Sequence, residues 1–426
     1  MKINKITIKN YKGIKDLEID LNGKNTVFFG ENGTGKTSIL NAITTLYYPI
    51  INKIALKKNK PVNILEEDIT FGESKTNLEL DLNINQKSKI FWLSKERKNS
   101  KNKSIDNNSL DQISEILKYQ LADSSKEMPI FINYGVHRTV FKVPLRIKIK
   151  HDSFSTVVAF ENCLNPITDF RTFFEWYRNQ EDIENELVRE NKDYVDIPLN
   201  SVKNAIYTFL PEISNLKIRR KPRLQMIVTK NKTTLQIQQL SDGEKCLLAL
   251  VGDIARRLSI ANTTSKNPLL CSGVVLIDEI ELHLHPKWQR YIIPNLNKTF
   301  PNIQFIITTH SPQVLGEVSD SNIFRFAREN EKLTVEKINS SFGWDSNFIL
   351  EHYMNTSKEN KEIKDLIEKL YTLIDEEYYS EAKELQKSLA SKLAFNTIHP
   401  DLVNSSILIR RGELKNDIHK KKRSTK

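Results

Sequence analysis

The segment GENGTGKTS, residues 30–38, constrains the fold of this chain more than any other. It follows the apolar run TVFFG at 26–30, typical of a buried strand, and precedes SILNAITTLYYP at 38–49, which predicts a helix ending at Pro49. A glycine-rich loop between strand and helix can turn its N–H groups toward a phosphate, and the helix dipole favours the same anion. The segment therefore predicts a phosphate-binding loop in an α/β fold.

This loop has the residue types that a nucleotide triphosphate needs. Lys36 supplies a positive charge to the outer phosphates, and the Thr37 hydroxyl is a ligand for Mg²⁺. The expected nucleotide-binding residues are Gly30, Glu31, Asn32, Gly33, Thr34, Gly35, Lys36, Thr37 and Ser38.

Two further predicted strands end in polar residues. GVVLIDEIE, 273–281, runs into Asp278 and Glu279, and FIITTHS, 305–311, ends at His310. Ligands bind beyond the carboxyl ends of strands in such sheets, so we expect Asp278 to hold Mg²⁺ through water and Glu279 to polarise the attacking water. His310 is expected to reach the γ-phosphate. An acidic turn after a strand, or a lone histidine at a strand end, often has only a structural role. The order of the three motifs along the chain favours a role in catalysis for these residues.

LSDGEK, 240–245, lies just before a predicted helix. Ser241 and Gly243 would present a hydroxyl and backbone amides at the helix N-terminus, which makes a second anion site. Ser241 and Glu244 also have the spacing of a helix capping box. The two interpretations are compatible.

Together these motifs resemble those of ABC-type ATPases, which include SMC and RecF-like proteins. The resemblance covers roughly residues 1–90 and 235–330 and implies hydrolysis of ATP with Mg²⁺. In that class a signature closes over ATP bound to another subunit. The resemblance therefore implies that two copies meet head to head and that these residues act in trans: Ser241, Asp242, Gly243 and Glu244.

The chain departs from that class at Asp242, where glycine is frequent, and at His285, where aspartate is usual. The segment ELHLHP, 281–286, resembles the OLD-like branch instead. His283 and His285 alternate with leucines and have no third ligand in sequence, so they do not predict a metal site. For the Q-loop residue of the class, Asp68 is the candidate.

The predicted fold class is α/β, an ABC-type P-loop NTPase head with a mixed sheet. Alternation at 2–9, 17–21 and 78–95 predicts an antiparallel N-terminal subdomain, and the strand–helix–strand order around 273–311 predicts parallel strands. Polar residues 95–109 predict a surface loop. No sustained heptads are present, so we expect a compact head without a long coiled coil.

The expected organisation is an ATPase domain at 1–340, with a helical insertion at about 161–215, and a C-terminal region at 341–426. Apolar residues at helical spacing continue from 201 to 213, so the helical region is expected to extend over these residues. The C-terminal region predicts a helical hairpin that docks a partner, followed by a basic tail.

Composition limits the partners. Lys and Arg number 64 against 53 Asp and Glu, a net charge of +11, which favours polyanions. RRKPR at 219–223 and KKKR at 420–423 are either solvated surface or nucleic-acid contacts. No apolar run could span a bilayer, so no membrane partner is expected. Cys163, Cys246 and Cys271 are scattered, which fits the cytoplasm.

Three further segments resemble the ATPase subunits of Septu-type anti-phage systems, which also occur beside some retrons: PIFINYGVHRTV at 129–140, FRTFFEWYRNQEDIENE at 170–186 and HPDLVNSSILIRRGE at 399–413. The resemblance implies a cytosolic ATPase that forms a dimer or higher oligomer and controls a separate HNH endonuclease. The eight histidines form no HNH cluster in sequence, so the nuclease must be another chain.

Two questions stay open in the sequence. The alternative function is a RecF-like DNA-binding repair ATPase that acts without a nuclease partner, which the basic runs permit. Arg138 could contact the nucleotide or form a buried salt bridge.

Overall fold

The computed structural model describes residues 1–55, 62–97, 103–136, 155–166, 170–329, 332–354, 356, 360–393 and 399–424, so Arg138 lies outside the described residues. The chain forms two compact units, Met1–Ile349 and Leu350–Lys426. The first unit extends past residue 340, where the sequence analysis placed the boundary, because Ile349 is fully buried beside Gly316.

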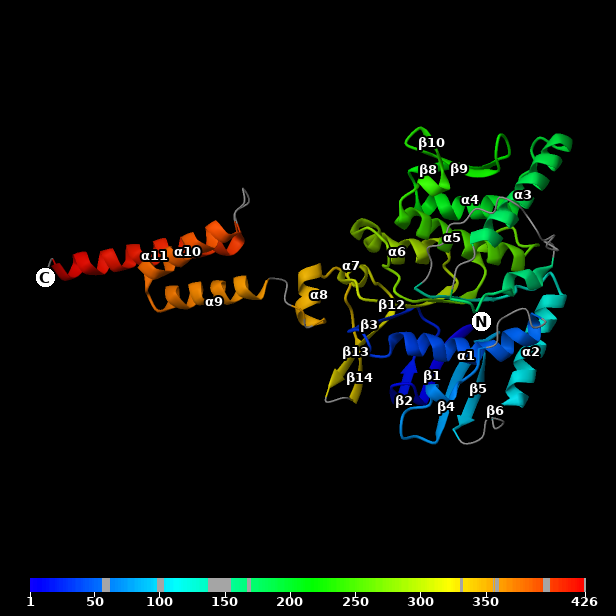
Figure 1. Cartoon of the computed structure of the whole chain (residues 1–426), viewed down its shortest axis with the longest axis horizontal. Helices are drawn as coiled ribbons and strands as arrows, with labels where there is room; N and C mark the ends of the chain where they lie inside the picture. Colours follow the sequence, from blue (N-terminus) through cyan, green and yellow to red (C-terminus); the bar gives the residue numbers. More distant parts are fainter. Residues whose placement is uncertain are drawn as a thin grey trace. The chain divides into compact units, whose positions relative to one another are not determined.

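The centre of the first unit is a six-stranded mixed sheet with the order β14-β13-β3-β12-β11-β7 (Figure 1). Five strands are parallel, and β14 is antiparallel to β13. The strands are β3 (Thr26–Gly30), β7 (Ile130–Tyr134), β11 (Gly273–Ile277), β12 (Ile303–Thr309), β13 (Asn322–Glu329) and β14 (Lys332–Ile338). The predicted mixed sheet is confirmed.

The N-terminal subdomain is an antiparallel sheet, as expected, with the order β2-β1-β4-β5-β6. Its strands are β1 (Lys2–Tyr11), β2 (Ile14–Asp20), β4 (Lys75–Ile84), β5 (Lys87–Glu96) and β6 (Lys103–Ile105). The prediction of one surface loop over 95–109 was wrong, because β6 pairs with β5 and α2 (Asn107–Ala122) begins within it. Asp106 caps α2 by accepting a hydrogen bond from the Ser109 N–H at 3.1 Å.

Helix α1 (Lys36–Ile54) contacts both sheets and runs between them (Figure 1). The prediction that it ends at Pro49 was wrong. A proline inside a helix costs about 3 kcal/mol, but burying an isoleucine contributes about 1.5–3 kcal/mol. Ile50, Ile51 and Ile54 are all buried in the extra turn, so burial outweighs the lost hydrogen bond.

The other side of the central sheet carries α5 (Asp242–Ala261), with α3 (Phe170–Glu190) and α4 (Ile197–Phe209) packed on it. Helical structure stops at Phe209, short of the predicted 213, because Pro211 disfavours helical backbone at Leu210. A three-stranded antiparallel sheet that the sequence analysis missed follows, with β8 (Ile213–Arg219), β9 (Gln225–Lys230) and β10 (Thr233–Gln236). The remaining helices are α6 (Pro286–Thr299), α7 (Pro312–Leu315) and α8 (Ser346–His352).

Beyond the end of α8, the described residues of the second unit form three helices, where the sequence predicted a hairpin and a tail. They are α9 (Lys361–Asp375), α10 (Tyr379–Lys392) and α11 (Pro400–Ser424). The basic run 420–423 therefore lies in a helix. The unit has its own apolar core of Ile367, Leu370, Ile374, Ala382, Leu389 and Ile409. In the described part of the chain, no helix is both long enough and apolar enough to cross a membrane.

Candidate ATP site

The three motifs meet at one edge of the central sheet. Strands β3, β11, β12 and β13 are parallel, so their carboxyl ends lie together there. A cavity of about 180 Å³ at this edge is lined by Gly13, Asn32, Gly33, Gly35, Lys36, Thr37, Ser38, Asp278, Glu279, Thr308, His310 and Arg328. Of the expected phosphate-loop residues, Gly30, Glu31 and Thr34 are outside this lining and support Lys36 instead.

The loop backbone requires glycine at its start. Gly30 has φ 139°, and a Cβ there would lie 2.0 Å from the carbonyl oxygen of Phe326 on β13. Gly35, with φ 100°, begins α1 in the left-handed region. Only glycine adopts these conformations readily, so the spacing of the glycines fixes the path of the loop around the cavity.

Lys36 is buried and folded onto its own loop. Its Nζ donates to the carbonyl oxygen of Gly30 at 2.9 Å and to that of Glu31 at 2.7 Å. Burial lowers the pKa of Lys36 to about 8, although Asp278, Glu279 and Glu281 oppose the shift. Lys36 is therefore mostly protonated at neutral pH and loses its charge as the pH rises through its pKa of about 8.

ATP affinity is expected to fall as pH rises from 7 to 9. Only protonated Lys36 attracts the phosphates, and its charge is lost as pH passes through its pKa of about 8. Titration calorimetry should show affinity about tenfold weaker at pH 9, since one unit above the pKa about a tenth of the lysine stays protonated. Lys36→Arg should remove this slope, since arginine keeps its charge. An equal slope in that variant would contradict the assignment.

Thr37 and Asp278, the two metal ligands that the sequence predicts, are hydrogen-bonded to each other. The Thr37 hydroxyl donates to Asp278 Oδ2 at 3.0 Å, and Thr308 Oγ1 donates to Asp278 Oδ1 at 2.6 Å. A hydroxyl and a carboxylate facing the same cavity are the hard oxygen donors that suit Mg²⁺. These residues fit the ion.

Glu279 is held in an unusual backbone conformation. Its φ is 46°, in the left-handed region that a glutamate seldom adopts, and its N–H donates to Thr308 Oγ1 at 2.7 Å. Such strain persists where surrounding contacts enforce it, and it is frequent at active sites. The half-buried Glu279 side chain lines the cavity beside Asp278.

His310 lines the same cavity from the end of β12. Burial, followed by the nearby charge of Lys36, lowers the pKa of His310, so the imidazole is neutral at pH 7. Its backbone N–H donates to Glu281 Oε1 at 2.5 Å, and Thr309 Oγ1 donates to Glu281 Oε2 at 2.7 Å. Glu281, which the sequence analysis did not single out, thus positions the strand end that carries His310. The nearby acidic residues Asp278 and Glu279 were a sequence signal for Glu281. The groups that Glu281 hydrogen-bonds cannot be predicted from the spacing of residues in the sequence.

The signature residues lie at the start of α5. Ser241 and Glu244 form the predicted capping box, in which the Ser241 N–H donates to Glu244 Oε2 at 2.9 Å. Lys230 on β9 forms an ion pair with buried Glu244 at 2.6 Å. A Cβ on Gly243 would lie 2.7 Å from the Trp288 ring, so α6 packs against this turn at a distance that only glycine allows.

Ser241, Asp242 and Gly243 line a different cavity, of about 570 Å³. Its other lining residues are Glu212, His283, Leu284, His285, Lys287 and Trp288, and within the described chain no phosphate-loop residue contributes to it. His285 caps α6, with Nδ1 accepting from the Lys287 N–H at 3.2 Å. Among the described residues no group of three or more His, Cys, Asp or Glu could hold a metal ion.

The chain is similar to known proteins over most of its length. The family described as AAA domain, putative AbiEii toxin, Type IV TA system, matches residues 26–316. The Retron Ec83 probable ATPase of Escherichia coli is 30% identical, over 92% of this chain and 83% of that protein. The chain belongs to this family of AAA-domain ATPases. The expected ATPase activity and the expected likeness to retron-associated ATPases are confirmed.

Two other similarities are broader. Septu protein PtuA of Bacillus mycoides (strain KBAB4) is 26% identical, over 92% of this chain and 50% of that protein. The likeness to Septu proteins is thus confirmed. Among solved structures, an SMC head bound to the C-winged helix domain of ScpA aligns with a TM-score of 0.49 and 15% identity, over 79% of this chain and 98% of that chain.

A buried polar cluster connects α5 to the edge of the central sheet that carries Asp278. Asp253 on α5 accepts hydrogen bonds from Arg256 and Arg257 and, at 2.8 Å, from the Tyr134 hydroxyl on β7. The Tyr134 carbonyl accepts from the Asp278 N–H at 2.9 Å. The arginine charges lower the pKa of Asp253 although burial opposes this, so the carboxylate stays ionised. The cluster gives α5 a fixed attachment to the strand end beside Asp278.

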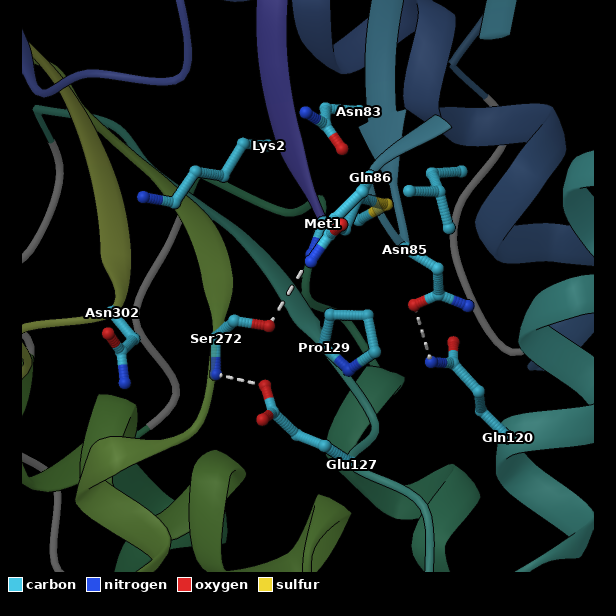
Figure 2. Close-up of a pocket in the computed structure, with 11 residues that line it drawn as sticks. Met1, Lys2, Asn83, Asn85, Gln86, Gln120, Glu127, Pro129, Ser272 and Asn302 are labelled. Carbon is cyan, nitrogen blue, oxygen red and sulfur yellow. Dashed lines mark hydrogen bonds between the residues drawn. The ribbon is translucent and has the colours of Figure 1, made fainter. Parts of the chain in front are cut away.

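A further cavity, of about 340 Å³, lies at the opposite edge of the same sheet (Figure 2). Pro129, Ser272 and Asn302 line it, and each directly precedes the first residue of a parallel strand. None of the predicted site residues reaches it. The sheet therefore separates this cavity from the ATP site.

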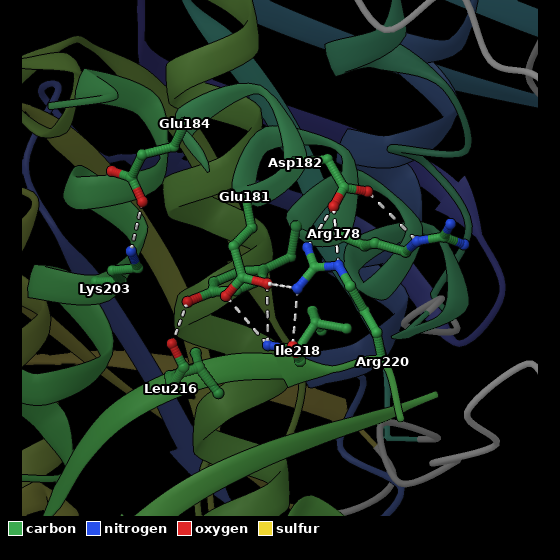
Figure 3. A network of polar contacts seen from close by, with 9 residues as sticks. Arg178, Glu181, Asp182, Glu184, Lys203, Leu216, Ile218 and Arg220 are labelled. Atoms are coloured by element: carbon green, nitrogen blue, oxygen red, sulfur yellow. Dashed lines mark hydrogen bonds and ion pairs between the residues drawn. The ribbon is translucent and has the colours of Figure 1, made fainter. Parts of the chain in front are cut away.

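The basic run 219–223 is partly structural. Arg220 forms ion pairs with Glu181 and Asp182 on α3, and the Ile218 N–H donates to Glu181 Oε1 at 3.1 Å (Figure 3). Arg220 thus joins β8 to α3 and is not free for another anion. The basic residues of this run that remain exposed and unpaired with α3 are Arg219, Lys221 and Arg223.

Proposed function

We propose that this ATPase is the nucleotide-sensing subunit of a bacterial anti-phage complex, in which two copies enclose ATP and control a separate HNH nuclease. The separation of two half-sites carries the proposal. The phosphate loop and the signature Ser241–Gly243 line different cavities of one chain, so an ATP held by both requires a second copy. The similarity to retron and Septu proteins supports the defence role.

In the proposed mechanism, residues 30–38 and the start of α1 hold the phosphates, and Lys36 exchanges its loop carbonyls for phosphate oxygens. Glu279 orients the attacking water and accepts its proton. Neutral His310 donates a hydrogen bond to the γ-phosphate, and Ser241 and Gly243 of the second copy add a hydroxyl and amides. Thr37 and Asp278 would hold Mg²⁺, which supplies charge neutralisation when bound.

This arrangement favours a role for ATP as a signal of assembly over a role as fuel for a motor. The composite site is complete only when two copies meet, so bound ATP reports assembly. Hydrolysis removes the γ-phosphate, the group that faces Glu279 and His310, and so releases the contact between copies. A slow turnover would prolong the assembled state.

The second unit is the proposed docking region for the nuclease. Helix α11 buries Ile409 in the core of the unit but exposes a set of apolar side chains: Val403, Ile407, Leu408 and Leu414. Exposed apolar residues clustered on one helix are typical of an interaction surface. In this proposal the cleavage chemistry belongs to the partner chain.

Deleting residues 355–426 is expected to abolish copurification with a co-expressed HNH protein from the neighbouring reading frame. ATPase activity should persist, because the deleted unit has its own core and all site residues lie in Met1–Ile349. Affinity purification and a phosphate-release assay test the two effects. Retained copurification would contradict the docking role.

The same deletion separates the alternative, a RecF-like ATPase that binds DNA without a nuclease. Exposed Arg219, Lys221 and Arg223 favour this candidate and lie in the first unit. Under it, the deleted protein would bind duplex DNA as well as the full chain, and no HNH protein would copurify with either.

A further inference from the structure

Arg328 is a cation of the ATP cavity that the phosphate-loop motifs do not include. It lies near the carboxyl end of β13 and lines the cavity together with Gly13 and the phosphate loop. A Cβ on Gly13 would lie 2.8 Å from a terminal nitrogen of the Arg328 guanidinium. The turn between β1 and β2 therefore has room for this guanidinium because residue 13 has no side chain.

The Arg328 side chain makes no hydrogen bond or ion pair with any residue that the structure describes. Arg325, on the same strand, pairs with Glu336 on β14 at 3.8 Å. Lys36, the other cation of the cavity, is held by two carbonyl oxygens. Arg328 is thus exposed at the rim of the cavity with its donors and planar face available to a ligand.

The order of strands determines which part of ATP meets Arg328. Strand β3, which leads into the phosphate loop, lies between β12 and β13. Glu279 and His310 follow β11 and β12, on one side of the loop, and Arg328 lies on the other side. If the γ-phosphate faces Glu279 and His310, the nucleoside extends toward β13 and Gly13.

We propose that Arg328 binds the nucleoside end of ATP by stacking its guanidinium on the base. Arginine stacks on aromatic rings through its planar face, and a cation over such a ring is favourable. Phosphate binding by Lys36 does not distinguish ATP from other polyphosphates. Arg328 then makes the site selective for a nucleotide. The inference rests on the proposed ATP site.

The test compares two ligands that share a triphosphate, ATP and inorganic tripolyphosphate, by titration calorimetry on the full chain. Arg328→Ala should weaken ATP binding about tenfold, between the size of an exposed and of a desolvated cation–π contact, and leave tripolyphosphate binding unchanged. Arg328→Lys, which keeps the charge but not the plane, should stay weakened. Arg325→Ala, on the same strand but outside the cavity lining, is the matched control and should bind ATP normally.

The outcomes distinguish failure of the stacking role of Arg328 from failure of the proposed ATP site. Unchanged ATP binding in Arg328→Ala, equal weakening for both ligands, or full recovery in Arg328→Lys would overturn the stacking role. Arg328→Gln repeats the test if the alanine variant unfolds at a lower temperature than the parent. Lys36→Ala should lose both ligands; if it kept both, the ATP site itself would be wrong.

Discussion

Replacing Glu279 with glutamine is expected to stop ATP turnover while ATP stays bound. The amide keeps the size of the side chain but cannot accept the proton of the attacking water, and losing a general base lowers the rate about 10²- to 10⁴-fold. Lys36, Thr37 and Asp278, which we propose hold the phosphates and the metal, are unchanged. The φ of 46° and the bond to Thr308 are backbone features and should persist.

Steady-state phosphate release and retention of radiolabelled ATP on gel filtration measure the two halves of this prediction. The trapped nucleotide should also stabilise the assembled form, visible by native mass spectrometry as an ATP-dependent dimer or larger oligomer. Lys36→Ala is the control, because it removes the phosphate contact and should give neither bound ATP nor assembly. Identical behaviour of the two variants would contradict the proposed site.

The sequence predicted the meeting of Lys36, Asp278 and His310 because each follows an apolar run in a strand–helix order. Parallel strands place their carboxyl ends at one edge, so Lys36 could be placed beside residues 242 or more positions further along the chain without knowing any contact. The capping box at Ser241 was equally predictable, since both partners lie within one helical turn.

Other features depend on contacts between distant segments and could not be predicted. Glu281 positions His310 through bonds to Thr309 and a backbone N–H, which spacing does not encode. Arg328 enters the cavity because β13 pairs with β3, and the sequence analysis did not recognise β13. Helix α1 passes Pro49 because the helix is buried between two sheets, a tertiary effect that overrides local propensity.

The proposed composite site predicts that two inactive variants restore each other. Lys36→Ala lacks a working phosphate loop but keeps its signature. Gly243→Ala keeps the phosphate loop, but its new Cβ would lie 2.7 Å from Trp288 and 2.8 Å from the His283 carbonyl oxygen, which displaces the signature turn. Each variant alone should hydrolyse little ATP. A mixed dimer contains one intact pair, the phosphate loop of the Gly243→Ala chain facing the signature of the Lys36→Ala chain.

Mixing the two purified variants should therefore regain phosphate release that neither shows alone. Gly243→Ala alone should still bind ATP, because its own phosphate loop lies in a separate cavity. The control is a chain with both changes mixed with Lys36→Ala, a pair in which no composite site has a working phosphate loop. Full activity of Gly243→Ala by itself, or no recovery on mixing although mass spectrometry shows mixed dimers, would mean that the signature does not act on the ATP of another copy.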